Sequence, residues 1–371
     1  MRGVGRRLVC WRTLAVSGLA LACVACGGGG AGTPTPPPSG PPNFVVAAAG
    51  DTQGYNILTD WVHPPDPLAA VRSNFAGSDL FVFNLEGPIL TNPPVTGQCP
   101  GVAGVNDEVI SGPAALADDL TLATVTVASI ANNHILDCGD AGIAETRTQL
   151  TARGIVAVGA GANLAEACAP ALVNVNGTPV AVVSYLAITP DPFTAGASRA
   201  GPASWAACNG AQMVQQLKAA GRYVIVVLHL HLYEGWNDIT PAAHIALATQ
   251  VIDAGADLVV AAGPHVPQGI LSRNGHAALM SLGDFLLRPS FPIPEAAYRS
   301  VVARIGVTLA SHSTSVELDP LRLGGIGIPH PPQPQDALMI LQEIASSSAT
   351  YLSTYLGVSG GKGHFTVHAT S

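Results

Sequence analysis

Five apolar, strand-like runs are spread along this chain of 371 residues, and each of them leads into a residue type that binds metal ions. The runs cover residues 44–49, 79–83, 123–130, 223–228 and 258–262. The residues that follow them are Asp51, Glu86, Asn133 with His134, His229 with His231, and His265. Because the carboxyl ends of strands in an open α/β sheet line a common crevice, residues far apart in sequence converge there. The order therefore predicts a metal site at a sheet edge, where metal-assisted hydrolysis is a common chemistry.

Helical stretches separate the apolar runs, a pattern typical of a layered α/β domain. Segments 67–75, 140–153, 211–220, 241–254 and 335–345 predict helices, and segments 301–310 and 313–318 predict further strands. Apolar residues make up 48% of the chain, which is ample for a buried core. We expect one domain over residues 44–348, including the strands after residue 285, and a C-terminal tail over 349–371 that is loose from residue 360 onward.

The N-terminus carries the pattern of an export signal. Four arginines precede a short apolar stretch over residues 14–25, which is too short to span a bilayer and is typical of a secretory signal. The stretch ends at Cys26 before four glycines, and this resembles a lipoprotein cleavage box in which Cys26 is lipidated. Cys23 occupies a place that normally holds leucine, and an ordinary signal peptide cut nearby is the alternative. We expect a signal peptide over 1–26, a Gly/Pro/Ser/Thr linker over 27–43, and a membrane-anchored lipoprotein that faces the periplasm or the cell exterior.

Cysteine usage and charge add two expectations. Of the seven cysteines, those outside the export segment are Cys99, Cys138, Cys168 and Cys208. An even number in an exported chain permits two disulfides with three possible connectivities, and the sequential pairing is our first choice. The formal net charge of −8 argues against a nucleic-acid partner, whose phosphates require clustered positive charge.

The two carboxylates differ in how strongly they indicate a site. Asp51 directly follows an apolar strand, and taken alone it is more simply explained as a turn or helix-capping residue. Glu86 ends a strand that is expected to be buried, where a carboxylate without a charge partner is rare. Glu86 is therefore the stronger candidate for a metal ligand.

The segment from Asn133 to Asp137 is the strongest local signal. An asparagine carbonyl is a neutral oxygen ligand for a divalent ion, and the imidazole of His134 can donate a proton to a leaving oxygen. Asp137 lies three residues further on and can orient that imidazole. The structural alternative makes Asn132 and Asn133 turn residues and His134 a helix cap.

Three histidines follow the later strands. His229 and His231 lie two residues apart, which places both imidazoles on one face of a strand, within reach of one ion or two neighbouring ions. One of them, more readily His231, can instead be a core histidine with satisfied hydrogen bonds. His265 follows another buried strand.

Seven motifs occur in an order that resembles the CapA-type capsule-synthesis proteins. They are GD at 50–51, NLEGPIL at 84–90, ANNHILDCG at 131–139, GAGANLAEA at 159–167, VLHLH at 227–231, GADLVVAAGPHVPQ at 255–268 and SLGDF at 281–285. These proteins take part in poly-gamma-glutamate biosynthesis and are relatives of the calcineurin-like metallophosphoesterases. The resemblance extends over residues 44–345, almost the whole exported portion.

The resemblance implies an α/β fold, a four-layer α-β-β-α sandwich of two mixed sheets with a two-metal site at its edge. By motif, the metal ligands are Asp51, Glu86 in the bridging place, Asn133, His229 and His265, and His134 is the acid for the leaving group. Manganese, iron or zinc is the metal implied.

Two departures from the family pattern concern the metal ligands. Metallophosphoesterases carry Asp-x-His where this chain has Gln53 as the third residue, and CapA-type proteins carry His-Pro-His where it has Gly263 as the first. His231 can compensate for the second loss. We therefore expect one or two divalent ions.

Two functions from different classes follow. The first is a metal-dependent hydrolase that acts on a phosphoester or an anionic polymer, tethered through Cys26 and associated with a capsule-synthesis membrane complex. The second is a non-catalytic accessory protein for assembly or retention of a surface polymer, with a degenerate metal site. A periplasmic protein that binds a small ligand is a third possibility, but it leaves the histidines unexplained.

Overall fold

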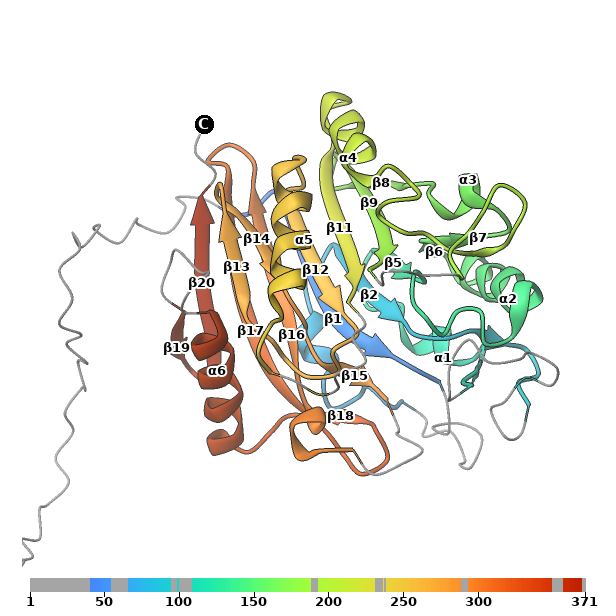
Figure 1. The fold of residues 1–371 in the computed structure, drawn as a ribbon. Helices are drawn as coiled ribbons and strands as arrows, with labels where there is room; N and C mark the ends of the chain where they lie inside the picture. The colour runs from blue at the N-terminus through green and yellow to red at the C-terminus, as the bar shows by residue number, and fades with distance from the viewer. Residues whose placement is uncertain are drawn as a thin grey trace, which may run out of the picture. The chain divides into compact units, whose positions relative to one another are not determined.

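The strands of this chain form two mixed β-sheets in the computed structural model (Figure 1). The structure describes residues 41–54, 66–94, 99, 109–187, 193–230, 236, 238–287, 293–348 and 356–368. The expected signal peptide, most of the linker and His231 lie outside these residues. None of the helices in the described part of the chain is long and apolar enough to cross a membrane.

The first sheet has the strand order β19-β20-β17-β16-β1-β2-β5-β6, with β15 beside β1 and β18 beside β17. Its strands are β1 (Phe44–Thr52), β2 (Leu80–Leu85), β5 (Val125–Ser129), β6 (Ile155–Val158), β15 (Asp284–Leu286), β16 (Arg299–Thr308), β17 (Ser313–Leu323), β18 (Pro329–His330), β19 (Gly357–Ser359) and β20 (Lys362–His368). Strands β1, β2, β5, β6 and β15 are parallel, whereas β16 pairs antiparallel with β1. The strands after residue 285 thus extend the sheet of the N-terminal strands.

The second sheet has the order β13-β14-β12-β11-β9-β8. Its strands are β8 (Ala171–Val175), β9 (Thr178–Leu186), β11 (Tyr223–His229), β12 (Leu258–Ala262), β13 (Ile270–Arg273) and β14 (His276–Leu279). Strands β9, β11, β12 and β14 are parallel, and β8 and β13 pair antiparallel at the edges. Two short pairs, β3 (Ile89–Leu90) with β4 (Gly112–Pro113) and β7 (Ala160–Gly161) with β10 (Gly201–Pro202), lie outside both sheets.

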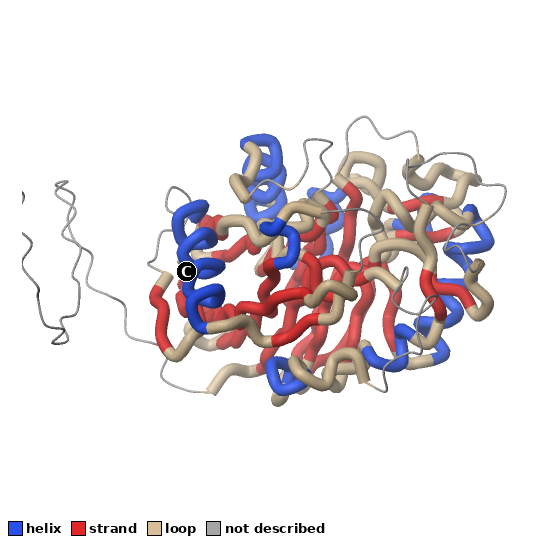
Figure 2. The backbone as a smooth tube through the Cα atoms, turned by 90° about the horizontal axis from the view of Figure 1, so that it is seen from below, coloured by secondary structure: helices blue, strands red, loops and turns tan. Residues whose placement is uncertain are grey.

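Helices lie around the two sheets, and Figure 2 shows them at the outside of the strands. They are α1 (Leu116–Asp119), α2 (Gly139–Ala152), α3 (Leu164–Ala167), α4 (Gly210–Ala219), α5 (Ala242–Asp253), α6 (Pro334–Ser348) and the 3-10 helices η1 (Arg72–Phe75) and η2 (Glu295–Tyr298). Helix α2 and η1 pack on the first sheet, whereas α4 and α5 pack on the second. The bounds of α2, α4, α5 and α6 agree with the predicted segments to within three residues.

Alternation along the strands separates three apolar layers. In β1, Val46 and Ala48 belong to the core between the sheets, whereas Ala47 belongs to the layer beneath η1 and α2. In β11, Ile225 faces the same central core, and Val226 faces the layer beneath α4 and α5. Each strand can bury both faces only if both are covered, so the helices are required on the outside. The predicted four-layer α-β-β-α sandwich is confirmed.

The helix predicted over residues 67–75 is wrong. These residues form turns followed by η1, a single 3-10 turn. Leu68, Val71 and Phe75 are buried, which gives the apolar spacing of an amphipathic helix without the helix itself. The chain leaves η1 in an extended conformation at Ala76 and reverses at Gly77, whose φ of 73° suits glycine.

The disulfides among the described residues follow the sequential pairing, Cys99 with Cys138 and Cys168 with Cys208. This prediction is confirmed. The first bridge joins the loop after β3 to the residue that precedes α2.

The expectation of a loose C-terminal tail is wrong for Lys362–His368. These residues form β20, which pairs antiparallel with β17 in the first sheet. Phe365 and Val367 alternate with partly exposed residues, and both reach the core between the sheets. The alternation was visible in the sequence, but the glycines around it suggested irregular structure.

The buried face of β20 should contribute measurably to stability. We expect Val367→Ala to lower the free energy of unfolding by about 2 kcal/mol, since two buried methyl groups are worth ~0.8 kcal/mol each and a cavity remains. Urea unfolding measures the change. The matched control is Val358→Ala in β19, where the side chain is 41% exposed and the change should stay within about 0.5 kcal/mol. Equal, small changes for both variants would contradict this account of β20.

Candidate metal centre

The inward rows of side chains become polar at the carboxyl ends of the strands. Along β2, Asn84 continues the inward row of Leu80 and Val82, and along β11, His229 continues the row of Ile225 and Val227. The Asn84 amide nitrogen lies 3.2 Å from Nδ1 of His229, so the two rows meet across the gap between the sheets. A polar edge therefore replaces the apolar core at this end of the sandwich.

Asp51, Glu86 and His265 converge at this edge. One ligand atom from each of the three lies within 4.8 Å of the others, although 214 residues separate Asp51 and His265 in the sequence. Nδ1 of His265 is 3.5 Å from Oδ2 of Asp51, and Nε2 of His265 is 3.7 Å from Oε1 of Glu86. Both carboxylates are buried, at 0% and 2% exposure. This trio is the candidate metal-binding group.

His229 lies beside the same two carboxylates. Its Nδ1 is 3.8 Å from Oδ1 of Asp51, and its Nε2 is 3.7 Å from Oε1 of Glu86. The Oε1 atom of Glu86 thus lies near the imidazoles of both His229 and His265. The family resemblance implies a bridging role for Glu86, and this role stays a prediction.

Asn132 holds the loop of Glu86 in place. Its side-chain nitrogen donates to the carbonyl of Leu85 at 2.7 Å, and its side-chain oxygen accepts from the backbone N–H of Gly87 at 3.3 Å. The residues on both sides of Glu86 are therefore fixed by one amide. Asn133, the predicted oxygen ligand, is buried next to it in the chain at 8% exposure.

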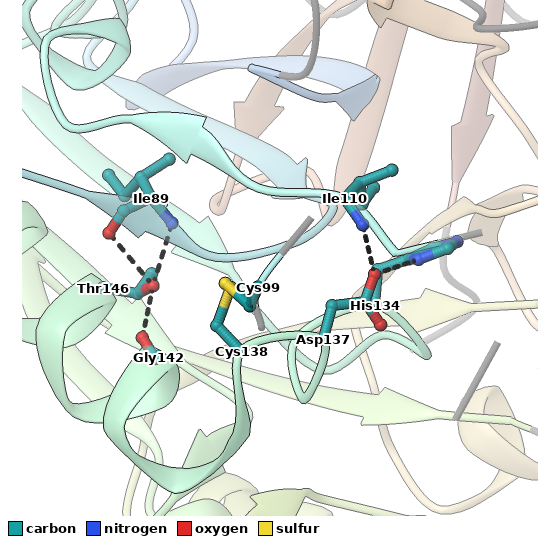
Figure 3. Close-up of a disulfide and its surroundings, with 8 residues drawn as sticks. All are labelled: Ile89, Cys99, Ile110, His134, Asp137, Cys138, Gly142 and Thr146. Carbon is teal, nitrogen blue, oxygen red and sulfur yellow. Dashed lines mark hydrogen bonds and ion pairs between the residues drawn. A yellow bond between two sulfur atoms is a disulfide. The ribbon is translucent and has the colours of Figure 1, made fainter. Parts of the chain in front are cut away.

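His134 and Asp137 form a hydrogen-bonded pair near the first disulfide (Figure 3). Nδ1 of His134 lies 2.7 Å from Oδ2 of Asp137, and the same oxygen accepts from the backbone N–H of Ile110 at 2.7 Å. Burial lowers the pKa of His134, but the hydrogen bond and the negative charge of Asp137 outweigh it and raise that pKa. The contact fixes the imidazole of His134 through Nδ1.

The two departures from the family pattern both supply hydrogen-bond donors to the carboxylates. The side-chain amide of Gln53 donates to Oε2 of Glu86 at 2.9 Å, and the backbone N–H of Gly263 donates to Oδ2 of Asp51 at 2.8 Å. Gly263 has a φ of 105°, and a Cβ there would lie 3.0 Å from the backbone of Leu230. A histidine at position 263 would thus be strained in this backbone.

A third carboxylate, Asp284, joins the group through its hydrogen bond to Nδ1 of His265 at 2.8 Å. Burial raises the pKa of Asp51 well above its ordinary value, and Glu86 raises it further. Burial likewise raises the pKa of Asp284 to about 6, although His265 opposes this. Burial also acts to raise the pKa of Glu86, but His265 and His229 prevail and lower it to about 2. Among the described residues, the ion pairs of these carboxylates go only to histidines, so a cation would stabilise their charged forms.

The donor atoms fit a divalent metal ion. Within the described part of the chain, Oε1 of Glu86 and Oδ2 of Asp284 are buried without a hydrogen-bond partner. Buried polar atoms in native proteins almost always have a partner, and a coordinated ion is one explanation for an orphaned carboxylate oxygen. Carboxylate oxygen together with imidazole nitrogen suits manganese, iron and zinc.

Four residues of this polar edge were not identified from the sequence. They are Gln53, which donates to Glu86, Asn132, which bonds the backbone on both sides of Glu86, Asn84 and Asp284. Asn84 and Asp284 each carry a signal, since both are polar residues inside motifs that otherwise form buried strands. Their partners lie on distant strands, so no spacing in the sequence identifies them.

Comparison with known proteins places this geometry in a family. A probable polyglutamine synthesis accessory protein of Mycobacterium tuberculosis is 30% identical over 61% of this chain and 60% of its own length. The capsule biosynthesis protein CapA of Bacillus anthracis is 32% identical over 43% of this chain and 40% of its own length. The chain thus spans about 60% or less of the curated relatives that it matches.

The solved structures that resemble this fold are more distant. A hypothetical protein from Thermus thermophilus is 15% identical, with a TM-score of 0.43, over 75% of this chain and 98% of its own. The NAD nucleotidase of Haemophilus influenzae is 12% identical, with a TM-score of 0.38, over 78% of this chain and 49% of its own. The model of the bacterial capsule synthesis protein PGA_cap matches residues 45–288, which include Asp51, Glu86, His265 and the other described residues of the site. The chain therefore belongs to the bacterial capsule synthesis protein family.

Proposed function

We propose that this chain is an exported, membrane-tethered protein of polymer capsule synthesis with a metal-dependent hydrolase site of the phosphoesterase type. The observation that carries the proposal is the convergence of Asp51, Glu86 and His265, with Oε1 of Glu86 buried and without a hydrogen-bond partner among the described residues. The export part rests on the charged and apolar pattern of residues 1–26 and on Cys26.

The residues of the site have different roles in the proposed hydrolysis. A bound divalent ion supplies a water of lowered pKa and neutralises negative charge on the scissile group. Asp51, Glu86 and His265 would hold such an ion, with His229 beside Glu86. His134 donates a proton from Nε2 to the departing oxygen, while Asp137 fixes the ring through Nδ1. The raised pKa of His134 keeps the imidazole protonated to a higher pH than an exposed histidine.

The polymer is proposed from the names of the relatives. They are described as proteins of polyglutamine synthesis and of capsule biosynthesis, which favours an extracellular polymer or a phosphoester intermediate of its synthesis as the substrate. The resemblance to poly-gamma-glutamate proteins makes an anionic polymer our first choice. The same site chemistry would suit a bond of the polymer or a phosphoester, because hydrolysis of either develops negative charge on an oxygen, which a divalent ion would stabilise.

The alternative is a non-catalytic accessory protein that assembles or retains the polymer. Gln53 and Gly263 favour it, because Gln53 puts an amide donor on Glu86 where the family pattern has an imidazole, and Gly263 has no side chain where the pattern has another imidazole. Such a protein would keep the fold of the site but bind metal weakly.

Removal of metal tests the proposal. We expect the purified protein to carry manganese, iron or zinc in stoichiometric amount by elemental analysis, and to hydrolyse a phosphodiester such as bis-p-nitrophenyl phosphate. Dialysis against a chelator should abolish turnover, and adding back one of these ions should restore it, because the ion supplies the activated water. A metal-free protein that still supports polymer retention in cells would favour the accessory role instead.

A further inference from the structure

We infer that Asp284 is a positioning residue of the metal centre, which fixes the His265 ring so that Nε2 is the nitrogen that binds the ion. The inference rests on the proposed metal site and adds a residue that the motif pattern did not assign to it. Asp284 lies in β15, which pairs in parallel with β1, and Asp51 is its direct cross-strand neighbour. The sheet itself therefore brings the two carboxylates side by side.

The contacts of His265 indicate which of its two ring nitrogens carries the proton and which carries the lone pair. Oδ1 of Asp284 lies 2.8 Å from Nδ1, which is hydrogen-bond distance, whereas Nε2 lies 3.7 Å from Oε1 of Glu86. A neutral imidazole has one N–H, and a carboxylate partner requires it at Nδ1. The lone pair is then on Nε2, on the side of Glu86. Histidines that bind metals commonly donate their other N–H to a carboxylate in this way.

Of the two carboxylates near Nδ1 of His265, Asp284 lies at hydrogen-bond distance, 2.8 Å, whereas Oδ2 of Asp51 lies further away at 3.5 Å. His265 follows β12 with a φ of 57°, in the left-handed region that is uncommon for a residue with a side chain. On another side the ring faces Trp236, at a distance of 5.2 Å between ring centroids and a tilt of 44°. An aromatic neighbour limits the space in which the ring can turn, but it does not determine which nitrogen carries the proton.

A purely structural role does not explain a carboxylate at position 284. The backbone pairing of β15 with β1 needs no particular side chain, and an asparagine would also accept the N–H of His265. Asp284 is instead completely buried beside two other carboxylates, and its Oδ2 has no hydrogen-bond partner in the described part of the chain. Burying a third negative charge there is unfavourable unless a cation is close. The charge is thus useful for holding an ion and unfavourable for folding alone.

Metal titration of the full-length protein tests the inference with Asp284→Ala and Asp284→Asn. After chelation, each protein is titrated with Mn²⁺ in a calorimeter, and the melting temperature of the metal-free form is recorded. Asp284→Ala should weaken Mn²⁺ binding by about 10–100-fold, as loss of such hydrogen-bond partners does. Asp284→Asn should lose less, because its amide oxygen still accepts from Nδ1–H. The matched control is Asp253→Asn, an exposed residue paired with Arg273, which should bind Mn²⁺ as wild type does.

The metal-free melting temperatures separate positioning from a structural role. We expect metal-free Asp284→Asn to melt at or above the wild-type temperature, since one buried charge is removed. Wild-type Mn²⁺ affinity in both variants would overturn the inference, and so would a lower melting temperature in Asp284→Asn with unchanged affinity. If wild type binds Mn²⁺ while the variants match it, only the positioning role fails. If wild type takes up no ion, the proposed function fails together with it.

Discussion

Glu86→Ala is expected to remove bound metal and to lower phosphodiester turnover by more than about 100-fold, because even a residue that only orients a ligand is worth about 10–100-fold. Glu86 is the most central residue of the site. Its Oε1 lies 3.7 Å from an imidazole nitrogen of both His229 and His265, and its Oε2 is held by Gln53. Truncation to alanine removes the carboxylate oxygen that lies near both imidazole rings.

Elemental analysis and initial rates measure this change, and circular dichroism checks that the variant is folded. The matched control is Glu295→Ala, whose carboxylate is exposed on η2 and pairs with Arg322 at the surface. It should keep its metal and its rate. A Glu86→Ala protein with wild-type metal content and turnover would show that the ion, if any, binds elsewhere.

His134→Gln is expected to reduce kcat by about 100-fold to 10,000-fold on a substrate with a poor leaving group, the usual range for general acid–base catalysis. The metal content should not change, because His134 is hydrogen-bonded to Asp137 and is not one of the candidate metal ligands. A substrate with a good leaving group, such as p-nitrophenolate, should suffer much less, since its oxygen departs without a proton. Measuring both substrates separates proton donation from metal binding.

The pH dependence of the rate is a second test of His134 as the proton donor. The pKa of His134 is raised by the hydrogen bond to Asp137, so the active, protonated form is complete below that pKa and is lost as the pH rises through it. The alkaline limb of the rate profile should be present in wild type and absent in His134→Gln. His312→Gln, at an exposed histidine remote from the site in sequence, is the control and should keep the wild-type profile. An equal loss on both substrates, with no change in the profile, would contradict the role of His134 as the acid.

Much of the fold followed from the sequence because the apolar runs are short, continuous and separated by helical periodicity. Strands β1, β2, β5, β11 and β12 lie within three residues of the predicted runs. The secondary-structure predictions were wrong in two segments, where the pattern of apolar residues did not correspond to the structure that forms. Residues 67–75 have buried apolar residues at helix-like spacing, but they form turns and a 3-10 helix. Lys362–His368 form a strand whose partner, β17, is distant in the sequence. Local composition cannot report a strand partner that lies more than forty residues away.

The sequence by itself determined which residues stand at the strand ends, since a polar residue after a buried run needs a reason to be there. It thereby identified Asp51, Glu86, Asn133, His134, His229 and His265 as candidates. Only the tertiary structure decided which of them meet, because their distances depend on the pairing of β1 with β2 and on the packing of one sheet against the other. It also added Asn84, which donates to Asp51 on the neighbouring strand and contacts His229 across the sheets, and Asp284, which contacts His265 across them. It showed that Gly263 gives a backbone N–H to Asp51 at a position where a histidine would be strained. Metal sites assembled across two sheets are encoded residue by residue, but their geometry exists only after the core between the sheets has formed.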